Sequence, residues 1–311
     1  MFDRFYPGMA WADHQAQTDI WPHAQHSRLV QAGGIQWHVQ QMGQGPCMLL
    51  LHGTGSGHFS WRGLLPALAE HFTVLAPDLP GHAFTSRGPE GALSLPGMAE
   101  GLRALMLQLN LTPQVIVGHS AGAAIAAHMA LHFDIASRST LIGLNPAWLP
   151  LPGVASWLFG PAAKLAALNP LSAWATAKLA AKPGAVAEWL SRTGSTLDAQ
   201  GLDLYTRVLS DSGHVHGVLS MMAAWRLKPL AARLHEVRNP VFMHIGAQDQ
   251  TVPPALAEEA CQRLPQARSH LQPGLGHLAH EQDPAGTARH ILRWCGVNPV
   301  EAESSAGHKA C

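Results

Sequence analysis

The chain of 311 residues carries 20 Lys plus Arg and 20 Asp plus Glu, so its formal net charge is zero. It therefore lacks the basic surface that attracts nucleic acid or an anionic membrane, and we expect neither as a partner. The length suffices for one large α/β domain or two ordinary ones, with ample sequence for a core.

The sequence predicts a cytoplasmic protein without a transmembrane segment. Its N-terminus carries Asp3 and Arg4 and lacks the apolar stretch of a signal peptide. No run of about 18 apolar residues is free of polar interruption. The cysteines show neither C-x-x-C nor zinc-like spacing, which favours reduced thiols over a disulfide framework; they are Cys47, Cys261, Cys295 and Cys311.

Residues 1–26 show no periodicity, and we expect an irregular N-terminal arm there. Two alternating runs follow in residues 28–39, separated by Gly33 and Gly34. Such a pattern is typical of a hairpin of antiparallel strands at a sheet edge. The core of the sheet domain is then expected to occupy residues 27–146 and 231–296.

A continuous apolar run, residues 47–51, predicts a strand buried on both faces. It leads into the glycine-rich segment 52–57, HGTGSG. This segment lacks the Lys-Ser/Thr pair of a phosphate loop and the spacing of a dinucleotide fingerprint. It fits better as a loop that turns backbone N–H groups toward a nucleophile, although a loop merely rich in glycine remains an alternative.

A second apolar run, residues 115–117, meets the pattern G-x-S-x-G and continues into an Ala-rich helical segment. A serine in such a strand-turn-helix is held above the sheet edge, which makes Ser120 our candidate nucleophile. Gly118 and Gly122 are needed because a side chain there would clash with the adjoining strand or helix. The alternative is a glycine-rich turn between buried elements.

From 147 to 230 the alternation of strand and helix stops. The segment is rich in Ala and Leu at helical spacing and is interrupted by prolines, so we predict a helical lid inserted after the sixth strand. A lid must present some apolar surface to the cleft beneath it. Our candidates for this surface are Trp148, Trp157, Met221 and Met222. Most aromatic residues of the segment are expected to pack internally.

Two further polar residues follow late strands. Asp249 comes after the run 240–246, and His277 comes after the short run 267–271. Parallel strands would bring both to the carboxyl edge where Ser120 lies, so His277 can act as the base and Asp249 can orient it. His280 is the rival base. Residues 297–311 are small and polar, and we expect disorder there.

Histidine is frequent, with 20 residues, so metal binding has to be weighed. No H-E-x-x-H motif and no cysteine or carboxylate cluster completes a site around the closely spaced pairs. The sequence therefore predicts neither a metal site nor a cofactor; the pairs are His23/His26, His214/His216 and His277/His280.

Five segments in order resemble the successive motifs of the α/β-hydrolase superfamily: 52–55 (HGTG), 78–82 (DLPGH), 118–122 (GHSAG), 246–249 (GAQD) and 274–277 (GLGH). The resemblance spans residues 27–295. It implies the α/β-hydrolase fold, a mostly parallel central sheet with helices on both faces.

The same resemblance implies the roles of individual residues. The family's chain order is Ser, Asp, His, and His277 matches its Gly-x-Gly-His turn. Some members carry the acid where this chain has Asn145, which favours Asp249. A serine in place of aspartate at the elbow argues against epoxide hydrolases and haloalkane dehalogenases. The N–H groups of Ala121 and Thr54 would hold the oxyanion, and we expect His52, Gly53 and His119 to contact substrate.

Residues 27–40, 93–98 and 118–124 more closely resemble the magnesium-chelatase accessory proteins of bacteriochlorophyll-synthesising bacteria. This implies a place near the insertion of magnesium into protoporphyrin, with a tetrapyrrole as apolar ligand and contact with magnesium chelatase. Three hypotheses remain open: a serine hydrolase of that pathway, a porphyrin-binding accessory protein without catalysis, and a general carboxylesterase or carbon-carbon hydrolase.

Overall fold

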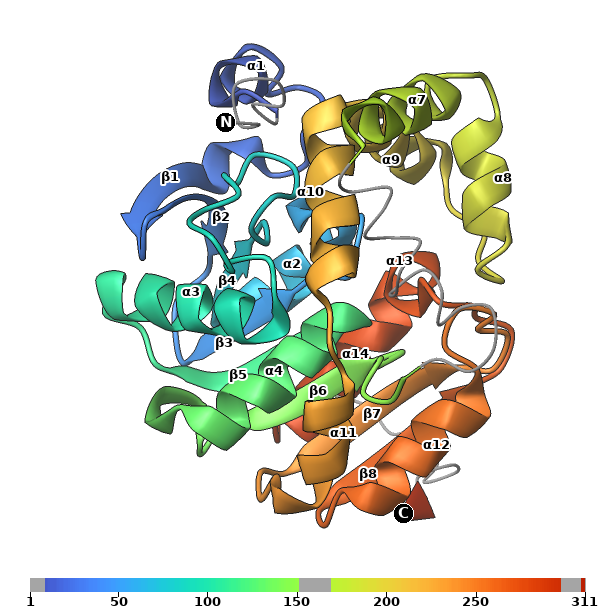
Figure 1. Ribbon diagram of the computed structural model, residues 1–311. Helices are drawn as coiled ribbons and strands as arrows, with labels where there is room; N and C mark the ends of the chain where they lie inside the picture. The colour runs from blue at the N-terminus through green and yellow to red at the C-terminus, as the bar shows by residue number, and fades with distance from the viewer. Residues whose placement is uncertain (1–8, 151–168, 298–308, 311) are drawn as a thin grey trace.

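A sheet of nine strands runs through the part of the chain that this computed structural model describes, which is residues 9–150, 169–297 and 309–310 (Figure 1). The strands lie in the order β1-β2-β4-β3-β5-β6-β7-β8-β9. Their bounds are β1 Ser27–Ala32, β2 Ile35–Met42, β3 Cys47–Leu51, β4 Thr73–Pro77, β5 Pro113–His119, β6 Thr140–Leu144, β7 Val241–Gly246, β8 Ala267–Gln272 and β9 Lys309–Ala310.

Strands β3 to β8 are parallel to one another. At one edge β2 pairs antiparallel with β4 and with β1, and at the other edge β9 pairs antiparallel with β8. The hairpin between β1 and β2 turns at Gly33 and Gly34, whose φ angles are 60° and 74°. Two successive positive φ angles fit the right-handed twist of a two-residue hairpin, and glycine adopts them without strain. The predicted hairpin and the predicted parallel sheet are both confirmed.

Helices cover both faces of the sheet, and the alternation of side chains along β3 shows how. Leu49 and Leu51 pack with α3, α4, α12 and α11 (Lys228–Arg233), while Met48 and Leu50 pack on the opposite face with α2 and α14. A strand buried on both faces is expected to be apolar throughout. The helices of the core are α2 Leu65–Ala69, α3 Leu95–Gln108, α4 Ala121–His132, α12 Pro254–Arg263, α13 Ala279–Gln282 and α14 Pro284–Trp294, with short 3₁₀ turns η3 His58–Trp61, η4 Asp134–Ala136 and η5 Leu234–Glu236.

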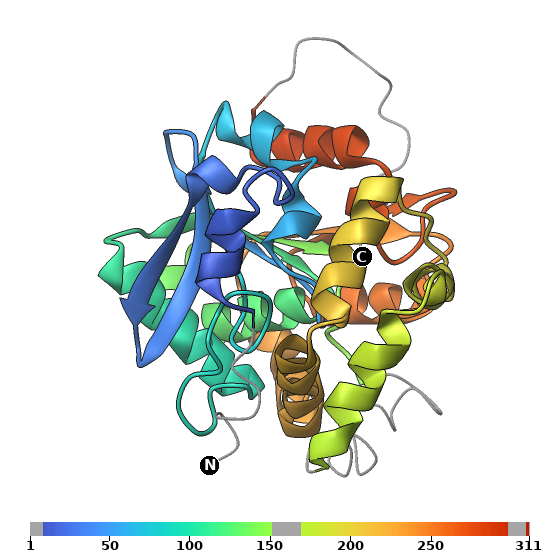
Figure 2. The ribbon, with the colours of Figure 1, turned by 90° about the horizontal axis from the view of Figure 1, so that it is seen from above.

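A helical insertion, defined here as the described residues from 169 to 233, separates β6 from β7 (Figures 1 and 2). Its apolar residues Leu204, Tyr205 and Val208 form one buried cluster with Phe59 and Leu278 of the core. The insertion is thus packed on the sheet domain by its own hydrophobic contacts. It contains α7 Pro170–Ala180, α8 Ala185–Ser191, α9 Ala199–Leu209, α10 Ser212–Ala224 and α11 Lys228–Arg233.

The two ends of the chain hold more structure than the sequence indicated. A short helix, α1 (Trp11–Ala16), and a 3₁₀ turn, η2 (Ala24–His26), interrupt the arm that was expected to be irregular. Lys309 and Ala310, within the tail expected to be disordered, form β9 against β8. Cys261 is disulfide-bonded, contrary to the expectation of reduced thiols throughout. Motif spacing detects only closely spaced cysteine pairs, and Cys261 belongs to none.

Among the described residues, no helix combines the length and the apolar character that crossing a membrane requires.

Candidate active site

Ser120 lies at the sharp turn between β5 and α4. Its φ and ψ angles are 51° and −114°, a conformation that a residue with a side chain adopts only under strain. Hydrogen bonds hold the turn: the Ser120 N–H donates to the carbonyl of Leu144, and the Ser120 carbonyl accepts from Ala123 and Ala147. The backbone around the serine is therefore fixed by neighbouring elements.

The two glycines of the motif are required by close approach of backbones. A Cβ at Gly118 would overlap the backbone of Ala123, and a Cβ at Gly122 would overlap the carbonyl of Leu51. Because backbone atoms cannot move aside as a flexible side chain can, only glycine fits at either position. The reason inferred from the sequence for these glycines is confirmed.

His277 and Asp249 form a buried hydrogen-bonded pair. The distance from His277 Nδ1 to Asp249 Oδ2 is 2.8 Å. Oδ1 of the same carboxylate accepts from the N–H groups of Thr251 and Val252, at 2.7 and 2.8 Å, and Oδ2 also accepts from Asn145. A carboxylate oxygen accepts hydrogen bonds, so Nδ1 of the imidazole donates this one, and Nε2 is the nitrogen left to act as a base.

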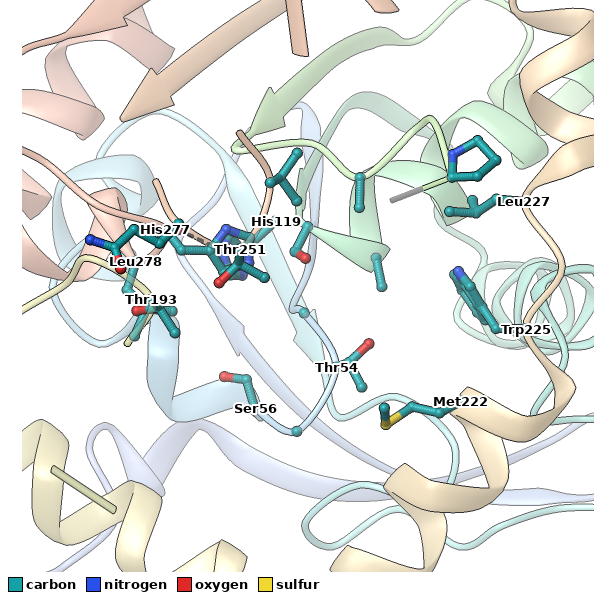
Figure 3. Close-up of a pocket in the computed structure, with 18 of the residues that line it drawn as sticks. Thr54, Ser56, His119, Thr193, Met222, Trp225, Leu227, Thr251, His277 and Leu278 are labelled. Carbon is teal, nitrogen blue, oxygen red and sulfur yellow. Dashed lines mark hydrogen bonds between the residues drawn. The ribbon is translucent and has the colours of Figure 1, made fainter. Parts of the chain in front are cut away.

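Ser120 and His277 both line one cavity of about 750 Å³. In Figure 3, His277, Thr193 and Thr251 lie on one side of this cavity, and Met222, Trp225 and Leu227 lie on the other. The remaining lining residues are mostly apolar or small: Gly53, Thr54, Gly55, Ser56, His119, Ala121, Ala147, Pro150, Leu190, Arg192, Tyr205, Leu209, Arg226, Lys228, Pro229, Gln250, Val252 and Leu278.

The two expected oxyanion donors, Thr54 and Ala121, line the same cavity as Ser120. Ala121 is the first residue of α4. The first N–H groups of a helix have no partner within the helix, and they carry its positive end. The N–H of Ala121 is therefore available to an anion formed beside the serine.

Some of the residues expected to contact substrate do line the cavity, and others do not. Gly53, His119 and Met222 are among the lining residues. His52 is not: it is fully buried, and its ring bonds the Gly53 carbonyl and the Leu79 N–H, both at 2.8 Å. The sequence gives its place after a strand but not the inward direction of its side chain.

Trp148 and Met221 are also misassigned as contact residues. Trp148 is buried and donates from Nε1 to the Ala123 carbonyl at 2.7 Å, so it contacts α4 in the interior of the protein. Met221 is fully buried and lies beside Thr54, whose hydroxyl approaches its sulfur at 3.8 Å. Both side chains fill the interior, as large apolar groups in helical segments usually do. Trp157 lies outside the described residues.

His280, the rival base, does not line the cavity. Its ring is fully buried, with its centroid 5.0 Å from that of Trp61 and 4.4 Å from that of His119. Burial lowers its pKa to about 3, with the neighbouring His277 adding to the effect. His119 in turn bonds the carbonyl of His277 through Nε2 at 2.9 Å, which steadies the loop that carries the candidate base.

The sequence reasoning missed a buried network beside the cavity. The Tyr205 hydroxyl donates to Glu281 Oε1 at 2.8 Å and lies 3.0 Å from the hydroxyl of Ser56. Glu281 also pairs with Arg62. Burial raises the pKa of Glu281 to about 7, against the opposing effect of Arg62. The residues come from three distant parts of the chain, so no local pattern could have indicated them.

Two basic side chains stand at the mouth of the cavity. Arg226 and Lys228 both line it and are exposed, and neither forms an ion pair with a carboxylate of the described residues. Within the described ranges, Arg226 donates to the backbone carbonyls of Ala223 and Trp225. An apolar cavity with unpaired cations at its mouth suits a ligand that has an apolar body and a carboxylate.

The stretch that follows α8 joins the insertion to the loops of the acid and the base. The Thr193 carbonyl accepts from the N–H groups of Gln250 and His277, each at 3.2 Å. Ser195 Oγ accepts from the Leu278 N–H at 2.8 Å. The insertion is thereby tied to the residues next to Asp249 and to His277 itself.

Comparisons with known proteins agree with this fold. A family model described as alpha/beta hydrolase fold matches residues 46–284. The chain is 36% identical over 284 residues to the magnesium-chelatase 30 kDa subunit of Rhodobacter capsulatus, covering 91% of this chain and 99% of the relative. It is 30% identical over 271 residues to a pimeloyl-[acyl-carrier protein] methyl ester esterase of Aromatoleum aromaticum, covering 80% and 98%.

Solved structures show the same fold. A hydrolase from Pseudomonas aeruginosa PA01 superposes with a TM-score of 0.69 at 22% identity, over 87% of this chain and 98% of that one.

Proposed function

Because the chain belongs to the α/β-hydrolase family, we propose that it is a serine hydrolase with Ser120 as nucleophile, His277 as base and Asp249 as the acid that orients the base. One observation carries this proposal. A strained serine at the end of β5 lines the same cavity as a histidine whose other ring nitrogen is bonded to a buried carboxylate.

The steps follow from the roles of these groups. His277 Nε2 takes the Ser120 proton as Oγ attacks the acyl carbon, and later returns it to the leaving group. Asp249 keeps the proton on Nδ1 and stabilises the imidazolium that forms. The tetrahedral oxyanion is held by the N–H groups of Ala121 and Thr54, and one such donor contributes about 2.7 to 4 kcal/mol to lowering the barrier. Water then releases the acyl group by the same steps.

The substrate that we propose is an ester or related acyl compound with a large apolar body. The volume of the cavity supports a large substrate, and the side of the cavity formed by Trp225, Met222 and Leu227 supports an apolar one. Arg226 and Lys228 at the mouth suit a free carboxylate. A tetrapyrrole monoester, in which one propionate is esterified and the other is free, has both features. The name of the Rhodobacter capsulatus relative supports an accessory role in magnesium-tetrapyrrole synthesis, with magnesium chelatase as a partner.

Two other functions remain candidates, each with its own support. The same cavity suits a porphyrin-binding accessory protein that does not hydrolyse its ligand. The methyl ester esterase relative supports a general carboxylesterase or carbon-carbon hydrolase acting on smaller compounds.

Labelling with a fluorophosphonate probe, with and without protoporphyrin, distinguishes the three candidate functions. An active hydrolase with a tetrapyrrole substrate is labelled at Ser120 and protected by protoporphyrin. Binding of protoporphyrin without any labelling supports the accessory protein. Labelling without protection supports an esterase with a smaller substrate. Hydrolysis of magnesium-protoporphyrin monomethyl ester and of short-chain nitrophenyl esters, measured in parallel, gives the same distinction by activity.

A further inference from the structure

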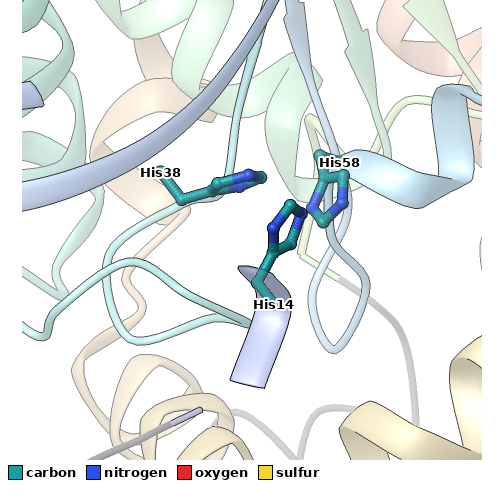
Figure 4. Close-up of side chains that lie close together, drawn as sticks. All are labelled: His14, His38 and His58. Atoms are coloured by element: carbon teal, nitrogen blue, oxygen red, sulfur yellow. The ribbon is translucent and has the colours of Figure 1, made fainter. Parts of the chain in front are cut away.

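Three histidines from distant parts of the chain meet in the interior. His14 lies on α1, His38 lies in β2 and His58 begins η3. All three are buried, and one ligand nitrogen from each lies within 4.8 Å of the other two. Figure 4 shows the three rings gathered around a common point, and we call them the histidine cluster.

The nitrogens of this cluster are left without hydrogen bonds. Both ring nitrogens of His14, Nε2 of His38 and Nε2 of His58 are buried and have no partner among the described residues. Buried polar atoms are almost always paired, because an unpaired one loses its hydration without compensation. Four such nitrogens at one place therefore indicate a site for a bound group that accepts lone pairs from several of them.

Asp78, at the end of β4, orients two of the rings. Its Oδ2 accepts from His38 Nδ1 at 2.7 Å, and its Oδ1 accepts from His58 Nδ1 at 2.9 Å. A carboxylate oxygen accepts hydrogen bonds, so both Nδ1 atoms donate to Asp78, and the Nε2 atoms are the ring nitrogens left to bind a further partner.

This is the arrangement in which histidines bind metals: a carboxylate holds the far nitrogen, fixes the tautomer and raises the basicity of the ligand nitrogen.

We propose that His14, His38 and His58 bind one divalent transition-metal ion, with Zn²⁺ as the best match, and that Asp78 orients two of its ligands. Imidazole nitrogens suit zinc and its neighbours in the periodic table rather than magnesium or calcium. Zinc–nitrogen bonds of about 2.0 to 2.1 Å place tetrahedral ligands about 3.4 Å apart. Ligand atoms already within 4.8 Å reach this spacing by small rotations of the rings, and the fourth position is left to water.

Packing alone does not explain the cluster. Trp11 stacks on His14 with ring centroids 4.5 Å apart, and Phe84 meets it edge-on at 4.8 Å. These contacts would serve a phenylalanine at position 14 equally well, and they leave the ring nitrogens unsatisfied.

The role that follows for the ion is structural. None of the three histidines lines the cavity of Ser120. The ion would instead fasten α1 onto β2 and onto η3, which directly follows the glycine-rich loop with Thr54. The site does not depend on the proposed hydrolase activity.

The test uses protein without a histidine tag, stripped with a chelator and titrated with Co²⁺ and with Zn²⁺. We expect one tightly bound equivalent, with the visible absorption of Co²⁺ held by nitrogen ligands, and a rise in Tm on adding Zn²⁺. His14→Phe should remove both effects while keeping the aromatic packing, and hence the fold as checked by circular dichroism. His26→Phe, in η2 but outside the cluster, should retain both.

A second group of candidate ligands, His244, His270 and His290, supplies the decisive comparison. If His270→Phe removes the bound equivalent and His14→Phe does not, the ion belongs to that group and the proposal is wrong. It is also wrong if the wild-type protein binds no Co²⁺, or if His14→Phe binds Co²⁺ with unchanged stoichiometry and affinity. His38→Gln provides a second variant of the cluster and should behave as His14→Phe does.

Discussion

Asn145 donates a hydrogen bond of 2.7 Å from Nδ2 to Oδ2 of Asp249, the same oxygen that bonds His277 Nδ1. The residue after β6 therefore reaches the carboxylate that follows β7, and Asn145 and His277 meet at one carboxylate oxygen.

A carboxylate at position 145 should partly replace the carboxylate at position 249 in ester hydrolysis. We expect Asp249→Asn to lower kcat by about 10⁴-fold, because an amide no longer holds the proton on Nδ1. Adding Asn145→Asp should recover a measurable part of this loss in steady-state ester hydrolysis. Asn145→Asp alone places two carboxylates in contact and should move the acid limb of the pH profile to higher pH. A double variant no better than Asp249→Asn would contradict the shared position.

Removing the nucleophile should abolish the reaction. We expect Ser120→Ala to lose fluorophosphonate labelling and about a million-fold in rate, since only binding and oxyanion stabilisation remain. His277→Ala should match it, because members of a triad act as a unit. Ser56→Ala is the control: Ser56 lines the same cavity, with its hydroxyl against Tyr205, and should still be labelled. If His280→Ala were the crippling change, the base would be misassigned.

Glu281 should make folding stability depend on pH. Its pKa of about 7 in the folded protein is above its ordinary value of 4.5, so folding favours the protonated form. This contribution is complete below about pH 4.5 and is lost as the pH rises through 7. Relative to wild type, Glu281→Gln should gain roughly 3 kcal/mol in the free energy of unfolding between these limits.

Denaturant unfolding at a series of pH values measures this difference. Asp198→Asn is the matched control, since Asp198 also pairs with Arg62 but is largely exposed. A difference between Glu281→Gln and wild type that does not change with pH would contradict the assigned pKa.

Trp225 should report binding of a tetrapyrrole. Burying about 400 Å² of a flat apolar face gives roughly 10 kcal/mol before the cost of association, which allows micromolar affinity. Protoporphyrin should therefore quench tryptophan fluorescence saturably, and Trp225→Phe should lose more of this signal than Trp174→Phe, which alters an exposed residue that does not line the cavity. Quenching that does not saturate would favour a smaller substrate.

The cations at the mouth of the cavity should discriminate a free carboxylate from an ester. We expect Arg226→Gln and Lys228→Gln each to weaken binding of protoporphyrin by about 0.2 to 1 kcal/mol, as is usual for exposed charge pairs, and to leave binding of its dimethyl ester unchanged. Lys182→Gln, elsewhere on the insertion, is the control. Competition titrations at low and high salt measure the effect, which should shrink as salt rises.

The sequence was informative where function depends on local pattern. Gly118, Ser120 and Gly122 are adjacent, so their spacing alone predicts the strained turn, and the strands before Asp249 and His277 predict the edge at which both lie. The directions of side chains were not available from such patterns. His52 and Met221 turn inward because hydrogen bonds and packing from other elements draw them there. The histidine cluster unites positions 14, 38 and 58, which no spacing rule connects.

The two hydrogen bonds that the Thr193 carbonyl accepts, from Gln250 and from His277, restrict how the cavity can be entered. Lifting α8 away from the sheet would break both bonds and release the loops that position the acid and the base. An enzyme that opened in that way would lose the alignment of Asp249 and His277 in every turnover. Substrate entry is therefore expected at the opposite wall, where Met222, Trp225 and Leu227 lie near the chain between α10 and α11. We therefore expect the side of the cavity beside α8 to stay in place when the cavity opens, and the side beside α10 to move.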